Sequence, residues 1–139
     1  MQKVRVCTLF SGSSANSVFI EVGGRGILID AGANITRCRE SLESVGSSFE
    51  KITAVFVTHE HSDHIKGLSC ISRRYKIPVL ANKPTLYGIK SSLYDIDTSF
   101  FREMPTGSKA SGGEFEVQSF ATSHDSAESV GYIITTPSG

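Results

Sequence analysis

Residues 58–64, which read T-H-E-H-S-D-H, constrain this 139-residue chain more than any other feature. Three of its four histidines and one aspartate gather there. The preceding run, residues 51–57, is rich in β-branched and aromatic residues and predicts a buried strand. Ile65, Leu68 and Ile71 then recur at helical spacing. The histidines are therefore expected on a strand-to-helix loop, at the carboxyl end of a strand, where ligands usually bind in α/β sheets.

The spacing within this loop fits two metal ions. His59 and His61 are two positions apart, so on an extended backbone their rings point the same way and Glu60 points away. Asp63 and His64 follow after the chain bends, and they can face a second ion beside the first. Two metal ions about 3.5–4 Å apart are the usual arrangement in two-metal hydrolytic sites. The loop therefore predicts metal-assisted hydrolysis, with Glu60 not counted as a ligand.

Two other interpretations compete with the metal pair. A helical zinc protease needs H-E-x-x-H, but Asp63 stands where the second histidine is required. A purely structural loop would cap the following helix through Ser62 or Asp63. Three histidines and an aspartate in this order favour metal binding over capping.

The order His59-x-His61-x-Asp63-His64 resembles the H-x-H-x-D-H signature of the metallo-β-lactamase-fold hydrolases. Residues 27–32 (I-L-I-D-A-G) resemble the strand-Asp-x-Gly element that precedes this signature in the family. Two further stretches are similar to motifs of one bacterial branch, the YycJ-like proteins: the small-residue loop 11–17 (S-G-S-S-A-N-S) and the metal-ligand motif 123–125 (S-H-D). Ala15 stands where that branch commonly has glycine. The likeness runs from about Cys7 to the end of the chain.

The resemblance implies a fold and a ligand set. The fold would be a four-layer αββα sandwich of the α/β (α+β) class, made of two similar halves. This chain, residues 1–139, would supply the first half and the start of the second, as an incomplete domain. His59, His61 and His124 would bind the first metal ion, and Asp63 and His64 the second. Asp63 would also be catalytic, because a carboxylate ligand can accept and release a proton.

The donor set also indicates which metals to expect. Imidazoles with one carboxylate suit zinc, with manganese or iron as alternatives. We therefore expect two divalent metal ions, Zn first among them. Such ions lower the pKa of bound water to about 7, which provides hydroxide at neutral pH.

His124 and Asp30 each have a plainer interpretation. His124 follows a strand-like stretch that begins at Phe115, and alone it would more often be a surface residue; beside the motif it is a predicted ligand. Asp30 closes an apolar run before a glycine, as a turn residue does. It can also be the carboxylate that orients the histidine loop, and this supporting role is favoured over direct ligation.

Two features bear on the substrate. The small-residue loop, with Ser13, Ser14 and Asn16, could present backbone N–H groups to a phosphate or be an ordinary turn. A group of cations lies further along the chain: Arg73, Arg74, Lys76 and Lys83. At a helix end such cations complement the dipole, so a solvated face is favoured over a nucleic-acid contact.

The rest of the pattern completes the expected element order. It predicts strands at 4–10, 18–22, 25–29, 77–81 and 130–136, and helices at 35–45, 65–75 and 85–92. Gly23 and Gly24, between the strands at 18–22 and 25–29, predict a hairpin turn. Pro78 predicts an edge position or a first residue for its strand. Residues 137–139 (P-S-G) read as a hairpin turn with no return strand. No histidine follows His124 and only Glu128 is acidic after Asp125, so we expect the chain to be a fragment.

Composition narrows the class and the compartment. The formal net charge is +0, so no bulk field argues for nucleic acid or a membrane. There is no apolar run for a membrane span or a signal peptide, and the three scattered cysteines argue against disulfides and against a cysteine zinc site. These features predict a cytoplasmic protein with no membrane partner.

Three function classes follow from the resemblance and the site. The first is a phosphodiesterase, most simply a nuclease acting on DNA or RNA. The second is a thioester, lactone or lactam hydrolase on the same fold, and the third is a catalytically incomplete metal-binding fragment. The small-residue loop favours the first over the second, and the ending at Gly139 supports the third. Nucleic acid is therefore a possible substrate, and the sequence does not indicate whether the protein has protein partners.

Overall fold

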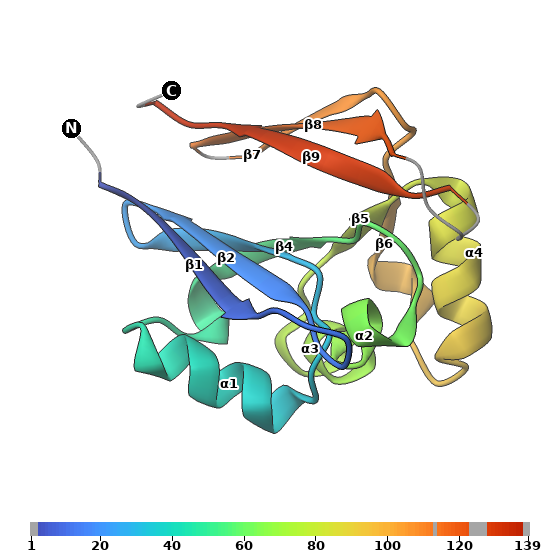
Figure 1. Cartoon of the computed structure of the whole chain (residues 1–139), viewed down its shortest axis with the longest axis horizontal. Coiled ribbons are helices and arrows are strands. Elements are labelled where there is room, and N and C mark those ends of the chain that lie inside the picture. The colour runs from blue at the N-terminus through green and yellow to red at the C-terminus, as the bar shows by residue number, and fades with distance from the viewer. Residues whose placement is uncertain (1–2, 113, 123–127, 138–139) are drawn as a thin grey trace.

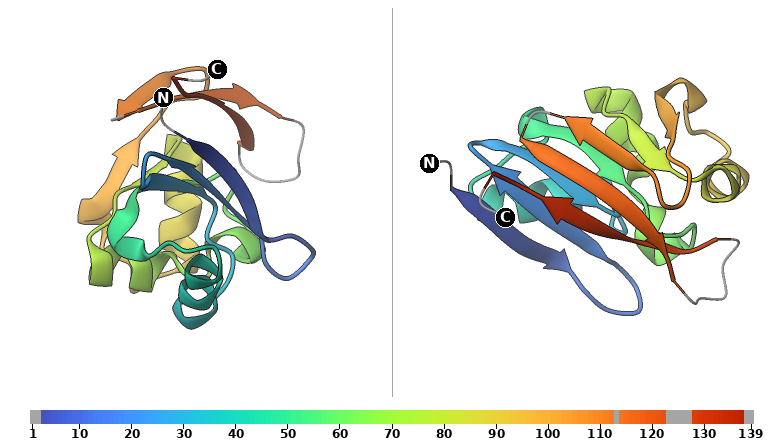
Figure 2. Two further views of the ribbon diagram at one scale, coloured as in Figure 1. Left: turned by 90° about the vertical axis from the view of Figure 1, so that its left-hand side faces the viewer. Right: turned by 90° about the horizontal axis from the view of Figure 1, so that it is seen from above.

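Two β-sheets stack face to face, and helices cover the outer face of the larger sheet (Figure 1). The computed structural model describes residues 3–112, 114–122 and 128–137. The predicted ligand motif at His124 and Asp125 lies outside these residues, as do the last two residues of the predicted hairpin turn. The described chain thus forms three layers, one of helices and two of strands, as the αββα prediction requires of its first part (Figure 2).

The larger sheet has six strands in the order in which they occur along the chain. They are β1 (Val4–Phe10), β2 (Ser17–Val22), β3 (Arg25–Ile29), β4 (Ile52–Phe56), β5 (Val79–Ala81) and β6 (Phe101–Glu103). The first three are antiparallel, and β3 to β6 are parallel. Gly23 and Gly24 form the β2–β3 turn at φ +58° and +83°, which this two-residue hairpin type requires. The predicted hairpin is confirmed.

The smaller sheet is antiparallel and packs on the larger one. Its strands are β7 (Lys109–Gly112), β8 (Phe115–Ala121) and β9 (Val130–Thr135). Alternate residues of β8, including Phe115 and Val117, point inward and join a core with Ile20, Ile27 and Phe56 of the larger sheet. This period of two is the pattern of a strand with one buried face.

In the part of the chain that the structure describes, the helical layer has four α-helices and two short 3₁₀ turns. They are α1 (Ile35–Ser44), η1 (Phe49–Lys51), α2 (Ser62–Ile65), α3 (Leu68–Tyr75), α4 (Lys83–Ser92) and η2 (Thr98–Phe100). Asn34 caps α1 by accepting from the Arg37 N–H, and Asn82 caps α4 by accepting from the Thr85 N–H. Within the described part of the chain, none of the helices has the length and apolar character needed to cross a membrane.

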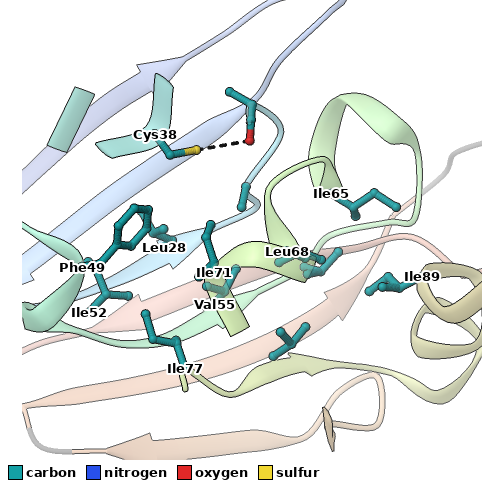
Figure 3. Close-up of a cluster of buried hydrophobic side chains, with 14 of the residues drawn as sticks. Leu28, Cys38, Phe49, Ile52, Val55, Ile65, Leu68, Ile71, Ile77 and Ile89 are labelled. Carbon is teal, nitrogen blue, oxygen red and sulfur yellow. Dashed lines mark hydrogen bonds between the residues drawn. The ribbon is translucent and has the colours of Figure 1, made fainter. Parts of the chain in front are cut away.

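The main core lies between the larger sheet and the helices (Figure 3). Leu28, Val55 and Leu68 are fully buried there. Cys38 fills this interior too: its thiol lies 3.4 Å from the Ala33 carbonyl, and burial raises its pKa to about 11. Cys38 is thus an interior residue, whereas Cys7 and Cys70 are half-buried.

One predicted element was wrong in detail, and one of the two positions predicted for Pro78 is excluded. The helix expected over 65–75 is interrupted between α2 and α3, because the backbone of Gly67 meets the 31–33 loop. Its N–H donates to the Ala31 carbonyl at 2.9 Å, and a Cβ atom there would lie 2.6 Å from the Ala33 oxygen. Of the two positions predicted for Pro78, the edge strand is excluded, because β5 lies between β4 and β6. Pro78 instead lies at the start of its strand, directly before Val79, the first residue of β5.

Candidate metal centre

The histidine loop follows the carboxyl end of β4, as the sequence predicts: His59 and His61 precede α2, and Asp63 and His64 lie in α2 itself. The ring of His59 is 4.7 Å from that of His61 and 3.9 Å from that of His64, measured between centroids. The His59 ring is therefore a neighbour of both other rings. Capping does not account for the loop, because the N-cap of α2 is His61, whose side chain makes no capping bond.

Glu60 turns away from the rings and packs on α4. A Cβ atom built at Gly88 of that helix would lie 2.5 Å from the Glu60 Cγ, so the glycine makes room for this side chain. The alternation expected of an extended segment therefore holds at His59, Glu60 and His61. It also brings α4 against the histidine loop.

Asp30 gathers three donors around one buried carboxylate. Its Oδ1 accepts from the Thr58 N–H at 2.8 Å, and its Oδ2 accepts from the Thr58 hydroxyl at 2.8 Å. The same Oδ2 lies 2.6 Å from Nδ1 of His64. The residue is 4% exposed and adopts a left-handed φ of +66°, a region that aspartate tolerates better than most residues. The carboxylate thus fixes the histidine loop and does not bond its own backbone as a simple turn residue would.

The contact with Asp30 sets the orientation of the His64 ring. A carboxylate only accepts hydrogen bonds, so Nδ1 carries the proton and Nε2 faces Asp63, whose Oδ2 is 3.2 Å away. Burial opposes a charged ring, but the hydrogen bond to Asp30 and the charges of Asp30 and Asp63 outweigh it and raise the pKa of His64. Nε2 of His64 and Oδ2 of Asp63 are therefore the pair of atoms presented together at this point.

The small-residue loop is tied to the same place. The side-chain amide of Asn16 donates to Oδ2 of Asp63 at 2.8 Å and to the Gly12 carbonyl at 2.9 Å. The backbone N–H of Asn16 also donates to the Asp63 carbonyl at 2.8 Å, and Nζ of Lys66 donates to the Ser14 carbonyl at 2.6 Å. The structure thus brings Asn16 onto Asp63 itself.

Not every residue predicted to act from the small-residue loop lies at the candidate metal centre. Ser13 and Ser14 remain exposed on the outer part of the loop. The roles of Thr58 and Lys66 were missed from the sequence, because their contacts reach residues 28 and 52 positions away.

The close approach of Gly32 to Asp63 gives a test of this packing. A Cβ atom at Gly32 would lie 1.8 Å from the Asp63 carbonyl oxygen and 2.5 Å from the Asn16 nitrogen. We expect Gly32→Ala to lower the free energy of unfolding by about 1–3 kcal/mol, or more if the backbone cannot shift. Urea denaturation measures this.

The control for this test is Gly112→Ala, whose added Cβ meets nothing within 4 Å and should change stability by less than about 0.5 kcal/mol. Equal midpoints for the two variants would contradict the packing.

The smaller sheet is joined to the histidine loop through β9. The Val130 N–H donates to the Thr58 carbonyl at 2.9 Å, and the Tyr132 hydroxyl donates to the Val57 carbonyl at 2.6 Å. Burial, with a contribution from the charge of Asp30, raises the pKa of Tyr132. Thr122 and Ser129 lie on either side of segment 123–127, and the Thr122 N–H donates to the Ser129 carbonyl at 3.1 Å.

The donors present fit part of the predicted metal site. A histidine whose Nδ1–H is held by a carboxylate is the common arrangement of a metal ligand. Within residues 3–112, 114–122 and 128–137, however, no three His, Cys, Asp or Glu side chains converge closely enough to form a complete ligand set. The predicted first set includes His124, which lies outside those residues. An imidazole-rich group with one carboxylate suits zinc chemically.

Comparison with known proteins places this geometry in a family. Residues 9–124 match the family model described as anti-Pycsar protein Apyc1. The chain is 34% identical over 124 residues to exodeoxyribonuclease YycJ of Bacillus anthracis, which covers 89% of this chain and 47% of the relative. It is also 34% identical over 119 residues to exodeoxyribonuclease WalJ of Streptococcus pneumoniae, covering 84% and 44%. The chain thus spans about half the length of the curated relatives it matches.

Solved structures agree on the fold. The subclass B3 metallo-β-lactamase MEM-A1, isolated from a soil metagenome library, superposes with a TM-score of 0.73 at 20% identity, covering 87% of this chain and 51% of that one. At this identity the likeness concerns the fold alone. The family model matches most of the chain, so the chain belongs to the family described as anti-Pycsar protein Apyc1. Its YycJ and WalJ relatives and its fold also agree with the YycJ-like branch of the metallo-β-lactamase-fold superfamily.

Proposed function

We propose that this chain carries the larger share of the active site of a metal-dependent phosphodiesterase that hydrolyses DNA or RNA. The observation that carries the proposal is the Asp30–His64–Asp63 arrangement. Asp30 holds Nδ1 of His64 at 2.6 Å, and Nε2 then lies 3.2 Å from Oδ2 of Asp63. Two ligating atoms are thereby presented side by side at the carboxyl end of the parallel strands.

In this proposal the ligands divide between two ions. His59 and His61, with His124, hold the first, and Asp63 and His64 hold the second. Zinc is the favoured metal, with manganese or iron as alternatives. When bound, the metals supply a Lewis acid and a water of lowered pKa. Asp30 is proposed as the orienting carboxylate, and Asp63 as a ligand that can also take up a proton near the reacting atoms.

A nucleic-acid substrate is supported by two independent observations. The relatives YycJ and WalJ are both named as exodeoxyribonucleases. The small-residue loop, where Ser13 and Ser14 are exposed, is fastened to the centre through Asn16. In that place its backbone and hydroxyl groups are proposed to meet the phosphate.

The proposal predicts a pattern of substrates. Protein expressed from the complete gene should cleave end-labelled DNA or RNA with added Mn²⁺ or Zn²⁺, and it should lose this activity in EDTA. A thioester and a lactam serve as competing substrates in the same assay. Cleavage of either of these without any cleavage of nucleic acid would reject the phosphodiesterase. No turnover of any substrate, together with metal binding, would support a metal-binding fragment instead.

A further inference from the structure

The outer face of α4 carries two cations with an aromatic ring between them. Lys83, Tyr87 and Lys90 follow one another at i, i+4 and i+7, the spacing of one helix face, and all three are exposed. Tyr87 is 73% exposed, while Leu86 and Ile89 on the inner face are buried. We call these three residues the α4 track. It is about 10 Å long at the rise of an α-helix.

The α4 track starts beside the proposed active site. Helix α4 follows β5, which runs parallel to β4, so α4 begins at the same sheet edge as the histidine loop. Glu60, between His59 and His61, packs on α4 at Gly88. The buried Asn82 that caps the helix also donates to the Glu128 carbonyl at 2.9 Å, which ties α4 to the segment leading into β9. In Figure 1, α4 flanks the end of the two sheets at which β9 begins.

The charges of this face are available to an anion. Helix α4 contains no acidic residue. Among the described residues, neither Lys83 nor Lys90 pairs with a carboxylate. The two acids that follow the helix are already engaged: Asp95 accepts from the Ser69 hydroxyl at 3.0 Å, and Asp97 accepts from the Ser99 N–H at 3.0 Å. The track itself therefore presents two ammonium groups and no carboxylate, while the carboxylates of Glu60 and Glu128 lie on the segments that pack against the helix from inside and at its N-terminus.

We propose that the α4 track binds a single nucleic-acid strand and leads it toward the metal centre. The two ammonium groups would contact phosphates, and the ring of Tyr87 would stack on a base. This is the combination by which proteins bind single strands without reading their sequence. Tyr94, 93% exposed just beyond the helix, offers a second ring further from the centre. The inference rests on the proposed phosphodiesterase function and names the form of the substrate.

The test measures binding without hydrolysis. Protein expressed from the complete gene is titrated into a 5′-labelled single-stranded oligodeoxynucleotide in EDTA, and fluorescence anisotropy is followed over a series of salt concentrations. Tyr87→Ala should weaken binding about 10-fold, while Tyr87→Phe, which keeps the ring, should bind as the parent does. Lys83→Gln with Lys90→Gln should reduce the salt slope by about 1.4, for two phosphate contacts on a single strand.

A matched control and separate readouts for binding and cleavage distinguish failure of the α4 track from failure of the proposed phosphodiesterase function. Lys51 is an exposed lysine directly before β4, so it lies at the opposite end of this strand from the histidine loop. Lys51→Gln should therefore change neither the affinity nor the salt slope. If Tyr87→Ala and the double lysine variant bind like the parent, the track is wrong even where nuclease activity is intact. Failure of the proposed function would instead appear as absent cleavage with the binding pattern preserved. If these variants turned a dimer into a monomer in sedimentation and left binding unchanged, the face would be a protein interface and the track would be rejected.

Discussion

Replacing His59 and His61 together by alanine is expected to abolish hydrolysis and to remove about one metal ion per chain. The two rings lie 4.7 Å apart at the carboxyl end of β4, and no other pair of histidines in the described chain is separated by a single residue. Loss of an orienting residue behind a metal ligand usually costs 10–100-fold, so loss of two ligands should cost about 100-fold or more. Elemental analysis of the purified protein and a metal-dependent cleavage assay measure the two effects.

The control for this experiment lies between the two histidines. Glu60 packs on α4 at Gly88, away from the rings, so Glu60→Gln should keep the full metal content. Circular dichroism should show that the double variant remains folded, because the core of the domain lies elsewhere, between the sheet and the helices. A double variant that keeps both its turnover and its metal would contradict the assignment of these residues as ligands.

The sequence predicted those parts of the centre that depend on local pattern. The alternation of His59, Glu60 and His61 follows from the extended backbone after a strand, and the structure has the same alternation. The hairpin at Gly23 and Gly24 was equally predictable, because few residues adopt the positive φ that its turn requires.

Long-range contacts could not be predicted in the same way. Asn16 reaches Asp63 across 47 positions, and Tyr132 reaches the Val57 carbonyl across 75. No periodicity connects such residues, because tertiary packing alone decides which loops meet. For this reason the sequence predicts Asn16 only as part of a substrate-binding loop, whereas in the structure its side-chain amide donates to the Asp63 carboxylate.

Short elements were missed for a related reason. Strands β6 and β7 have only three and four residues, and much of each is exposed. Without a buried face they show no alternation, and their place in a sheet depends on neighbouring strands. The break at Gly67 likewise depends on the 31–33 loop, which the helical spacing of Leu68 and Ile71 does not reveal.

Asp30→Asn is expected to weaken binding of the second metal ion about 10- to 100-fold while leaving the first nearly unchanged. Asparagine keeps the size of aspartate and tolerates the left-handed backbone at φ +66°, so the change isolates the carboxylate. An amide has one acceptor oxygen, whereas this carboxylate accepts from the Thr58 N–H, the Thr58 hydroxyl and Nδ1–H of His64. At least one of these donors must then face an NH₂ group.

If His64 is the donor that loses its acceptor, we expect its ring to change tautomer, with the proton on Nε2, the nitrogen that faces Asp63. A protonated Nε2 cannot bind a metal, and a buried donor left without its partner should also lower stability by about 1–3 kcal/mol. Calorimetric titration of metal-free protein with Zn²⁺ separates the two binding steps, and urea denaturation gives the stability. Asp97→Asn is the matched control, since Asp97 is exposed and caps only η2. An Asp30→Asn protein that binds two ions with parental affinities would show that Asp30 serves the loop's packing and not the metal.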